Sequence, residues 1–351
     1  MRRAIFSQMI TFYAPGQPGV QLTDHAICAD LTRTAVWIDL FEPTPGDEQA
    51  LEEALGVDVP TREEMQAIEL SSRLYEENGM LFMTATVLTK ADTNSPQSSA
   101  ITFILTGEKL LTLRYADSAA FAAFRTRREA NLQRFQTSYQ FMGGLIDAII
   151  ERIADILEGV VVNLDRISLK VFDAEAPDGT SQWENQPRKR RGGKGRKARQ
   201  RDFVEILRRI GAVSDLVSRA RESLVSFARL VTFFREVRQA DAAARESLVH
   251  TKTVIADLGS LSDHASFLSG KVSFLLDATL GMINNEQNAI IKILSVAALV
   301  FLPPTLVAGI YGMNFEFIPE LKWAHGYLFA LALMVIAAVL PYLFFRGRGW
   351  L

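Results

Sequence analysis

The sequence is poor in the residues that build disulfide-bonded and metal-binding proteins. It has one cysteine and four histidines among 351 residues. The lone Cys28 cannot form a disulfide within the chain, which fits a reducing compartment. The histidines at positions 25, 250, 264 and 325 show none of the spacing that is typical of a zinc site. We therefore expect no resident metal held by thiolates and imidazoles.

Motifs of enzyme active sites are also missing. The chain has no phosphate-binding loop, nucleophile elbow, metalloprotease motif or patterned pair of carboxylates. We expect no catalytic residue, no cofactor and no site that couples an energy source to transport. The N-terminal stretch MRRAIFSQMITFYAPG lacks an apolar run of the length found in signal peptides.

Charge is missing from two stretches near the C-terminus. ILSVAALVFLPPTLVAGIY (293–311) and GYLFALALMVIAAVLPYLFF (326–345) contain no charged residue. Each approaches the ~20 residues that cross a bilayer as a helix. A buried core helix could explain one such run, but two in succession favour two membrane spans.

Cations flank these stretches unevenly. Lys271, Lys292, Arg346 and Arg348 lie on one side, against Lys322 in the connecting loop. Because positively charged flanks stay inside, both termini are predicted to be cytoplasmic, with residues 312–325 outside. The net charge of −2 gives no general attraction to nucleic acid.

Residues 1–135 are predicted to form a cytoplasmic α/β domain. Apolar runs at 35–40, 80–88, 100–105 and 109–115 have the composition of strands, and the TGE segment before the last run predicts a hairpin. Helices are predicted over 44–55 and 61–70. In the second of these, Thr61 and Glu64 form a capping box.

Between residues 136 and 289 the hydrophobic period becomes that of long helices. An apolar seam that steps by three and four residues predicts a helix of ~35 residues from about Ser138. The seam consists of Ile146, Ile150, Ile153, Leu157, Val160, Leu164, Ile167 and Val171. A second long helix is predicted near 202–240, and a third runs from about 243 into the first apolar stretch as a stalk.

A loop at 177–201 separates the first two long helices, and its end, Arg188–Arg201, reads RKRRGGKGRKARQR. Antiparallel packing of the second helix beside the stalk would bring this loop within about 20 Å of the inner leaflet. Anionic headgroups there attract each cation by about 1 kcal/mol. A solvated tether is the alternative, and the glycine content does not suit a folded nucleic-acid reader.

Four polar residues lie within or close to the first apolar stretch. They are Asn288, Ser295, Thr305 and Asn314. Two helices cannot enclose water, so a channel requires several subunits that each contribute one polar-striped helix. A two-span anchor for a cytoplasmic sensor or scaffold is the alternative, and it predicts no polar stripe.

The outer loop begins Tyr311-Gly312-Met313-Asn314 and continues FEFIPELKW (315–323). Together with NNEQNAIIKILSVAALVFLPPTL before it, AVWIDLFEP near the start and a cationic tail at 346–351, this segment resembles the CorA family of magnesium and cobalt transporters. The resemblance covers essentially the whole chain. It implies an α+β cytoplasmic domain, long stalk helices and two C-terminal transmembrane helices, assembled as a homopentameric funnel in the cell inner membrane. The first span, 290–311, would line the pore, and 326–345 would be the second.

The resemblance also implies roles for particular residues. An outer ring that selects a hydrated ion would consist of Gly312, Met313 and Asn314. The pore-lining positions would be Asn288, Leu294, Leu302 and Thr305, with the two leucines as a hydrophobic constriction. The loop acids Glu316 and Glu320 would concentrate cations. Regulatory Mg²⁺ between cytoplasmic subunits would bind among Glu63, Glu64, Glu69, Asp257 and Asp263.

The implied function is influx of Mg²⁺ down its electrochemical gradient, controlled by intracellular Mg²⁺, with Co²⁺ and Ni²⁺ as further candidate ions. Oxygen ligands such as those of asparagine suit Mg²⁺, which gives up its water reluctantly. A Zn²⁺ transporter of the same superfamily is the alternative within this fold. The FEFIPEL continuation favours the magnesium branch.

Overall fold

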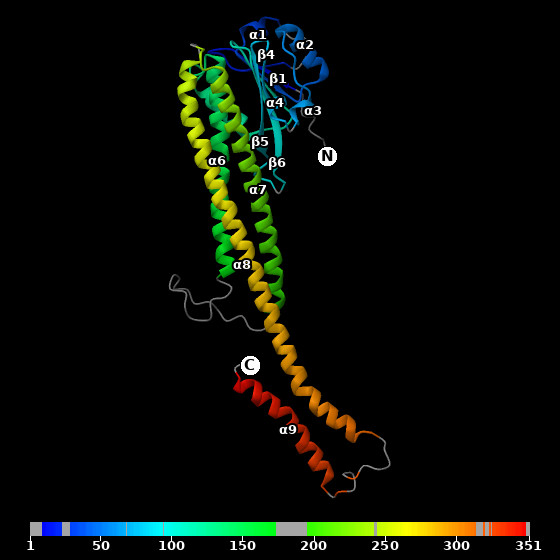
Figure 1. The fold of residues 1–351 in the computed structure, drawn as a ribbon. Coiled ribbons are helices and arrows are strands. Elements are labelled where there is room, and N and C mark those ends of the chain that lie inside the picture. Colours follow the sequence, from blue (N-terminus) through cyan, green and yellow to red (C-terminus); the bar gives the residue numbers. More distant parts are fainter. Residues whose placement is uncertain are drawn as a thin grey trace. The chain divides into compact units, whose positions relative to one another are not determined.

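The computed structural model describes residues 9–22, 29–67, 69–93, 95–172, 195–241, 244–313, 319, 323 and 325–348. The chain divides into two compact units, Met1–Leu276 and Asp277–Leu351. The helices are α1 (Ala29–Thr34), α2 (Pro45–Leu55), α3 (Arg62–Met65), α4 (Leu70–Arg73), α5 (Ala119–Ala130), α6 (Ser138–Phe172), α7 (Gly195–Val237), α8 (Arg245–Tyr311) and α9 (Gly326–Gly347). The first unit combines a sheet with long helices, and the second contains the end of α8 and α9 (Figure 1).

The sheet has seven strands in the order β2-β1-β3-β7-β6-β5-β4. Their bounds are β1 (Met9–Tyr13), β2 (Val20–Leu22), β3 (Trp37–Phe41), β4 (Leu74–Glu77), β5 (Met80–Thr89), β6 (Gln97–Leu105) and β7 (Leu110–Arg114). All neighbouring pairs are antiparallel except β3 and β7, which run parallel. The four predicted strands are confirmed as β3, β5, β6 and β7. The predicted hairpin joins β6 to β7, where the Thr106 amide donates to the Lys109 carbonyl at 3.0 Å.

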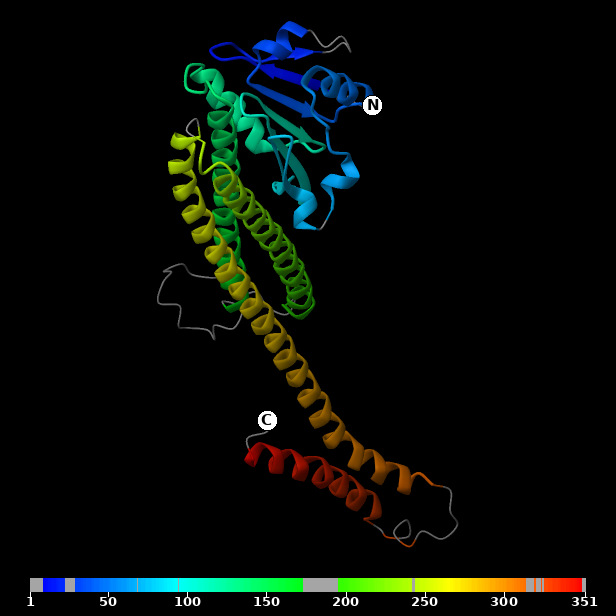
Figure 2. The same cartoon turned by 45° about the horizontal axis from the view of Figure 1, so that its top comes forward.

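Alternate residues of the strands fill a core on each face of the sheet. On one face, Ile38 of β3 belongs to a cluster with Leu51 of α2 and Met65 of α3. On the other, Trp37 packs against aromatic rings of α5 and α6, with ring centroids 5.5 Å from Phe124 and 5.6 Å from Phe141. Helices therefore cover the sheet on both sides (Figure 2).

Side-chain caps begin two of the helices on the first face. Thr44 and Asp47 form a capping box at the start of α2, and Thr61 and Glu64 form the predicted one at α3. The single helix predicted over 61–70 is wrong, because α3 ends at Met65 and α4 begins at Leu70. Met65 is the one buried residue of α3, and so short an apolar anchor cannot sustain a longer helix.

The long helices follow their sequence periods closely. The helix predicted from Ser138 is α6, 35 residues long, and all eight residues of its predicted seam are buried. The third predicted helix is α8, which continues without a break for 67 residues through Pro303 and Pro304. Helix α7 begins at Gly195 and not near 202, so the cationic segment ends in a helix. Residues 196–201 carry Arg, Lys, Ala and Gln, which are good helix formers. Residues 173–194 lie outside the described part of the chain.

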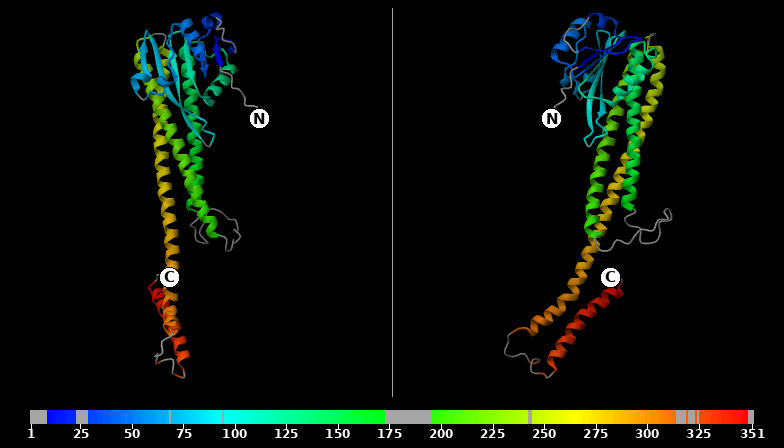
Figure 3. Two further views of the ribbon diagram at one scale, coloured as in Figure 1. Left: turned by 90° about the vertical axis from the view of Figure 1, so that its right-hand side faces the viewer. Right: turned by 180° about the vertical axis from the view of Figure 1, so that it is seen from behind.

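In the first unit, α6, α7 and the first part of α8 lie side by side (Figure 3). Lys271 of α8 forms an ion pair with Asp165 of α6 at 2.6 Å. Helix α7 lies along β5. At Thr86, a residue of β5 beyond the end of β4, side chains of α7 satisfy the backbone groups. The Thr86 amide donates to Ser226 Oγ at 2.9 Å, and Ser223 Oγ donates to the Thr86 carbonyl at 2.8 Å. These serines satisfy strand groups that would otherwise be unpaired at an edge.

A buried ion pair joins the two parallel strands. Asp39 of β3 and Arg114 of β7 are 1% and 2% exposed, with Arg114 Nη2 at 2.9 Å from the carboxylate. Thr112 Oγ1 also donates to Asp39 at 2.8 Å, and Trp37 Nε1 donates to Thr112 at 3.0 Å. The Arg114 guanidinium lies 4.4 Å from the ring centroid of Phe41. The charge of each partner is thus compensated within a buried layer.

We predict that Asp39→Ala destabilises the protein strongly, because it leaves the buried Arg114 charge with only the exposed carboxylate of Asp117, 3.7 Å from Nη1, as a counter-ion. The expected loss is about 3–5 kcal/mol in the free energy of unfolding. Urea unfolding of the detergent-solubilised full-length chain, followed by tryptophan fluorescence, measures this loss.

The matched control is Asp215→Ala, which breaks an ion pair with Arg219 on the exposed surface of α7. It should change the free energy of unfolding by under about 0.5 kcal/mol. Equal effects of the two substitutions would contradict a structural role for the buried pair.

Candidate functional site

Two helices of the described chain, α8 and α9, are long and apolar enough to cross a membrane. In the most apolar stretch of each helix, 0% of the residues of α8 and 6% of the residues of α9 are buried in the structure. The core helix of a water-soluble protein would be mostly buried, and a signal sequence would lie near the N-terminus, so neither explains them. Within the second unit, α9 runs in the direction opposite to the end of α8 (Figure 3).

One face of α8 differs from the rest of the helix. Stepping by alternating three and four residues from Asp277 gives a row that we name the α8 seam. It consists of Asp277, Gly281, Asn284, Asn288, Ile291, Ser295, Ala298, Leu302, Thr305, Gly309 and Gly312, all exposed. Only Ile291 and Leu302 are large and apolar. A seven-residue step drifts by ~20° per heptad on a straight helix, so neighbouring members of the row share a face, while the whole row turns by about 100° from Asp277 to Gly312.

The remaining surface of α8 within the span is apolar. Its exposed side chains include Ile293 at 56%, Phe301 at 70% and Leu306 at 62%. No carboxylate or cation lies between Ile293 and Tyr311. The helix therefore has a broad surface suited to lipid and a narrow face that is not.

Three of the four expected pore-lining residues, Asn288, Leu302 and Thr305, lie on the α8 seam. The fourth, Leu294, lies beside it and is 70% exposed. Ser295 belongs to the polar stripe expected from the sequence, whereas Asp277 and Asn284 were not expected on it, although the three-and-four step extends to them.

The signature residues lie where α8 ends. The Gly312 amide donates to the Ala308 carbonyl at 2.9 Å, and Met313 donates to Ile310 at 3.3 Å. A Cβ at position 312 would meet the Ala308 carbonyl oxygen at 3.0 Å, so this turn favours glycine. Asn314, Glu316 and Glu320 lie outside the described residues.

The two prolines weaken the backbone of the span. Because proline has no N–H, the carbonyls of Leu299 and Val300 lose their usual intrahelical donors. Thr305 Oγ1 donates to the Phe301 carbonyl at 2.7 Å, so the Thr305 oxygen offers its lone pairs to any further partner. Groups of this kind persist in a membrane only where water or neighbouring helices satisfy them.

The expected regulatory acids are dispersed in the first unit. Glu63, Glu64 and Glu69 are exposed near α3, and Asp257 and Asp263 are exposed on α8. The Glu64 carboxylate already accepts from the Thr61 amide at 2.8 Å and from its hydroxyl at 2.9 Å. No group of three or more His, Cys, Asp or Glu side chains that could hold a metal occurs in the described part of one chain.

Comparison with known proteins relates this chain to one family of magnesium transporters. Residues 33–182 and 196–347 match the family described as CorA-like Mg²⁺ transporter protein. The magnesium transport protein CorA of Escherichia coli K12 is 33% identical over 317 residues, covering 90% of this chain and 92% of that protein.

Two solved structures share the fold. The complete CorA magnesium transporter of Methanocaldococcus jannaschii aligns with a TM-score of 0.69 at 16% identity, covering 100% of both chains. The ZntB cytoplasmic domain of Vibrio parahaemolyticus aligns with a TM-score of 0.53 at 11% identity, covering 80% of this chain and 100% of that one.

We predict that water reaches the α8 seam but not the opposite face of the helix. The test uses a Cys28→Ser background, which removes the one native thiol, with a single cysteine at Ser295 or Ala297. Ser295 lies on the seam, whereas Ala297 lies ~200° away around the helix. A membrane-impermeant thiol reagent should label the Ser295→Cys protein in vesicles at least about tenfold faster than the Ala297→Cys protein, because reaction requires a hydrated thiolate. Equal rates at the two positions would contradict a hydrated seam.

Proposed function

Because this chain belongs to the family of CorA-like Mg²⁺ transporter proteins, we propose that it conducts Mg²⁺ across the cell inner membrane down the electrochemical gradient. The observation that carries this proposal is the part of the α8 seam within 293–311, a row of mostly small and polar side chains along an otherwise apolar span. Lipid cannot solvate the hydroxyl groups of Ser295 and Thr305 or satisfy the carbonyls of Leu299 and Val300. A pathway for water and ions can do both.

Several copies of the chain are needed to enclose this pathway. One α8 and one α9 cannot surround water, but a ring of α8 helices with their seams inward can. The family resemblance favours five copies. In such a homopentamer the apolar surface of α8 and α9 would face lipid or the neighbouring subunits.

Flanking charge supports the orientation. Lys271, Lys292, Arg346 and Arg348 lie on one side of the spans and Lys322 on the other. The positive-inside rule then gives cytoplasmic termini and an external loop at 312–325. Mg²⁺ would enter through that loop and leave past Asp277 at the inner end of the seam.

Selection would take place on a hydrated ion. Mg²⁺ holds its water tightly and prefers oxygen ligands in octahedral geometry. A ring of Asn314 amides with Gly312 and Met313 would accept hydrogen bonds from that water, and Glu316 and Glu320 would raise the local cation concentration. Below the ring, Thr305 and Asn288 offer further oxygens, and Leu302 and Leu294 would narrow the path. Co²⁺ and Ni²⁺ also prefer octahedral shells and are further candidate ions.

Transport of Zn²⁺ is the second candidate, favoured by the fold shared with the ZntB cytoplasmic domain. That likeness concerns the fold alone. Neither His nor Cys occurs on the α8 seam, and these are the ligands that Zn²⁺ prefers. Uptake of Mg²⁺ and Zn²⁺ into the same proteoliposomes distinguishes the two candidates.

Regulation by intracellular Mg²⁺ would require acids from two subunits, since no metal cluster occurs in the described part of one chain. Asp257 and Asp263, both exposed on α8, are the best placed of the expected residues. Glu64 is less suited because its carboxylate caps α3. Bound Mg²⁺ would offset repulsion between acids of adjacent subunits and favour a closed state.

The cationic segment Arg188–Arg201 is proposed to contact anionic headgroups. Its charge favours this contact, since each lysine or arginine near an anionic surface is attracted by about 1 kcal/mol. No role in binding nucleic acid is proposed.

We predict that Asn314→Ala lowers Mg²⁺ uptake into proteoliposomes at least about tenfold, because it removes the acceptors for the hydrated ion. Asn314→Gln, which keeps the amide, should lose less. Size-exclusion chromatography in detergent verifies that each variant assembles as the wild type does. Normal uptake by an assembled Asn314→Ala protein would contradict the assignment.

We further predict that Asp257→Asn combined with Asp263→Asn weakens inhibition by internal Mg²⁺. The half-inhibitory concentration should rise at least about fivefold, the scale of a coupling free energy of 1–3 kcal/mol. Glu158→Gln, which neutralises an exposed acid of α6, is the control and should not change it. A double variant with wild-type inhibition would exclude both aspartates.

A further inference from the structure

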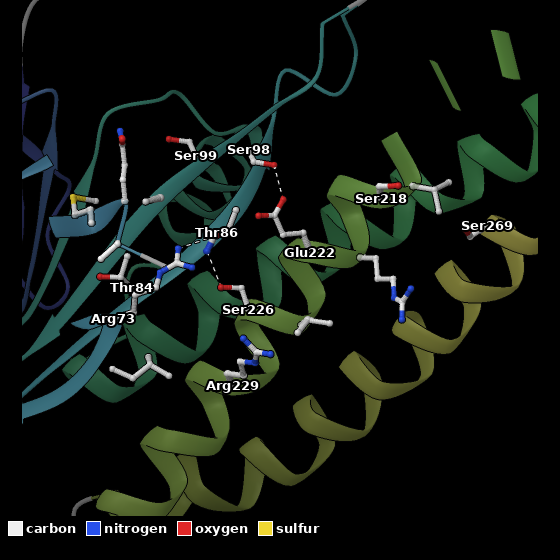
Figure 4. A pocket seen from close by; sticks show the side chains of 18 residues that line it. Arg73, Thr84, Thr86, Ser98, Ser99, Ser218, Glu222, Ser226, Arg229 and Ser269 are labelled. Atoms are coloured by element: carbon white, nitrogen blue, oxygen red, sulfur yellow. Dashed lines mark hydrogen bonds between the residues drawn. The ribbon is translucent and has the colours of Figure 1, made fainter. Parts of the chain in front are cut away.

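A cleft of about 730 Å³ lies in the first unit, away from the residues of the α8 seam. β5 and β6 supply one wall, the α3–α4 segment a second, and α7 from Val217 to Arg229 a third (Figure 4). Ser269 of α8 also lines it. These residues are far apart in the chain, and no sequence pattern groups them.

The lining is rich in hydroxyl groups and guanidinium groups. The hydroxyls belong to Thr84, Thr86, Ser98, Ser99, Ser218, Ser226 and Ser269. The guanidinium groups belong to Arg73 of α4 and to Arg221 and Arg229 of α7. Apolar side chains, among them Leu74 and Val225, complete the walls.

Arg73 is held in place but only partly satisfied. Its Nη2 donates to Thr86 Oγ1 at 2.9 Å, while its buried Nε has no partner within the described residues. Burial lowers the pKa of Arg73; the carboxylate of Glu222 opposes this effect and the charge of Arg229 adds to it. The guanidinium is therefore a half-buried cation whose surroundings do not fully compensate it.

The charges in the cleft do not balance. Three arginines face one acid, Glu222, which already accepts from Ser98 Oγ at 3.0 Å. Among the described residues no carboxylate lies within 4.0 Å of the guanidinium nitrogens of Arg73, Arg221 or Arg229. By contrast, Arg219 of the same helix has a partner in Asp215 at 2.9 Å. The arginines of the cleft thus have unused capacity for an anion.

We propose that this cleft binds a small phosphate-bearing molecule of about nucleotide size. Guanidinium groups bind phosphate through paired, charge-assisted hydrogen bonds, and hydroxyls can donate to its remaining oxygens. The volume lies within the ~300–1,000 Å³ of small-molecule sites. The apolar walls fit the uncharged part of such a ligand. This site goes beyond the proposed ion conduction and does not depend on it.

Binding would tie α7 to the sheet. Arg73 belongs to the segment before β4, whereas Arg221 and Arg229 belong to α7, so a ligand that fills the cleft would contact both elements. The two elements already meet at Thr86, through the hydrogen bonds of Ser223 and Ser226. A ligand there should therefore raise the thermal stability of the protein.

The test is isothermal titration of the detergent-solubilised full-length protein with ATP and with pyrophosphate, at a fixed free Mg²⁺ concentration and with adenosine as the uncharged comparison. We expect ATP to bind and adenosine not to bind. Arg221→Gln combined with Arg229→Gln should weaken ATP binding at least about tenfold. Both residues are exposed, so the substitutions should not prevent folding.

The matched control is Arg208→Gln, which removes an exposed arginine of α7 that does not line the cleft. It should leave the ATP affinity unchanged. Failure of the wild type to bind either phosphate compound would overturn the proposal. So would equal affinity of the double variant and the control. If the wild type does not bind and the double variant dissociates into monomers, the arginines contact a neighbouring subunit instead.

Discussion

The structure depends on one constraint: the apolar surface at the end of α8 and along α9 has no cover within a single chain. Leu294, Leu302 and Tyr327 are 70%, 69% and 78% exposed. Each leucine left in water forgoes about 1.5–3 kcal/mol of burial free energy. A surface of this extent must be covered by lipid, by other copies of the chain or by both. The α8 seam limits how they can be arranged, since its polar groups cannot face lipid without cost.

The first unit, in contrast, covers its own apolar surface. Its sheet is covered on both faces, the backbone of Thr86 is satisfied by serines of α7, and the buried charges of Asp39 and Arg114 compensate each other. This unit buries its own core, whereas the second cannot. The second unit therefore needs lipid or other copies of the chain to cover it, whereas the first unit does not.

The sequence predicted those elements whose pattern has a local cause. The α6 seam repeats over 35 residues, so its period alone identified the buried face. β5 and β6 are long and apolar. β2 was missed because it is a three-residue strand at the edge of the sheet, and β4 because its LYEE sequence is half exposed and lacks alternation. β1, which pairs with both β2 and β3, was also missed. The start of α7 was placed too late because the glycines of the cationic segment obscured the good helix formers that follow.

The two candidate sites also differ in whether a local sequence pattern indicates them. The α8 seam is periodic, and three of the four pore positions that family resemblance implied fall on it. The arginine cleft could not be predicted from the sequence. Arg73 and Arg229 line the same cleft only because β4 pairs with β5 and α7 passes alongside. No period or motif in the sequence indicates that these two arginines line one cleft. If the α8 seam lines the proposed cation path, that path lacks carboxylates between Ile293 and Tyr311. A divalent ion that keeps its water needs acceptors for that water more than charges, and too strong a ligand would hold it in place. Widely spaced oxygens on Asn288, Ser295 and Thr305, separated by Ile291 and Leu302, fit passage of such an ion better than its storage.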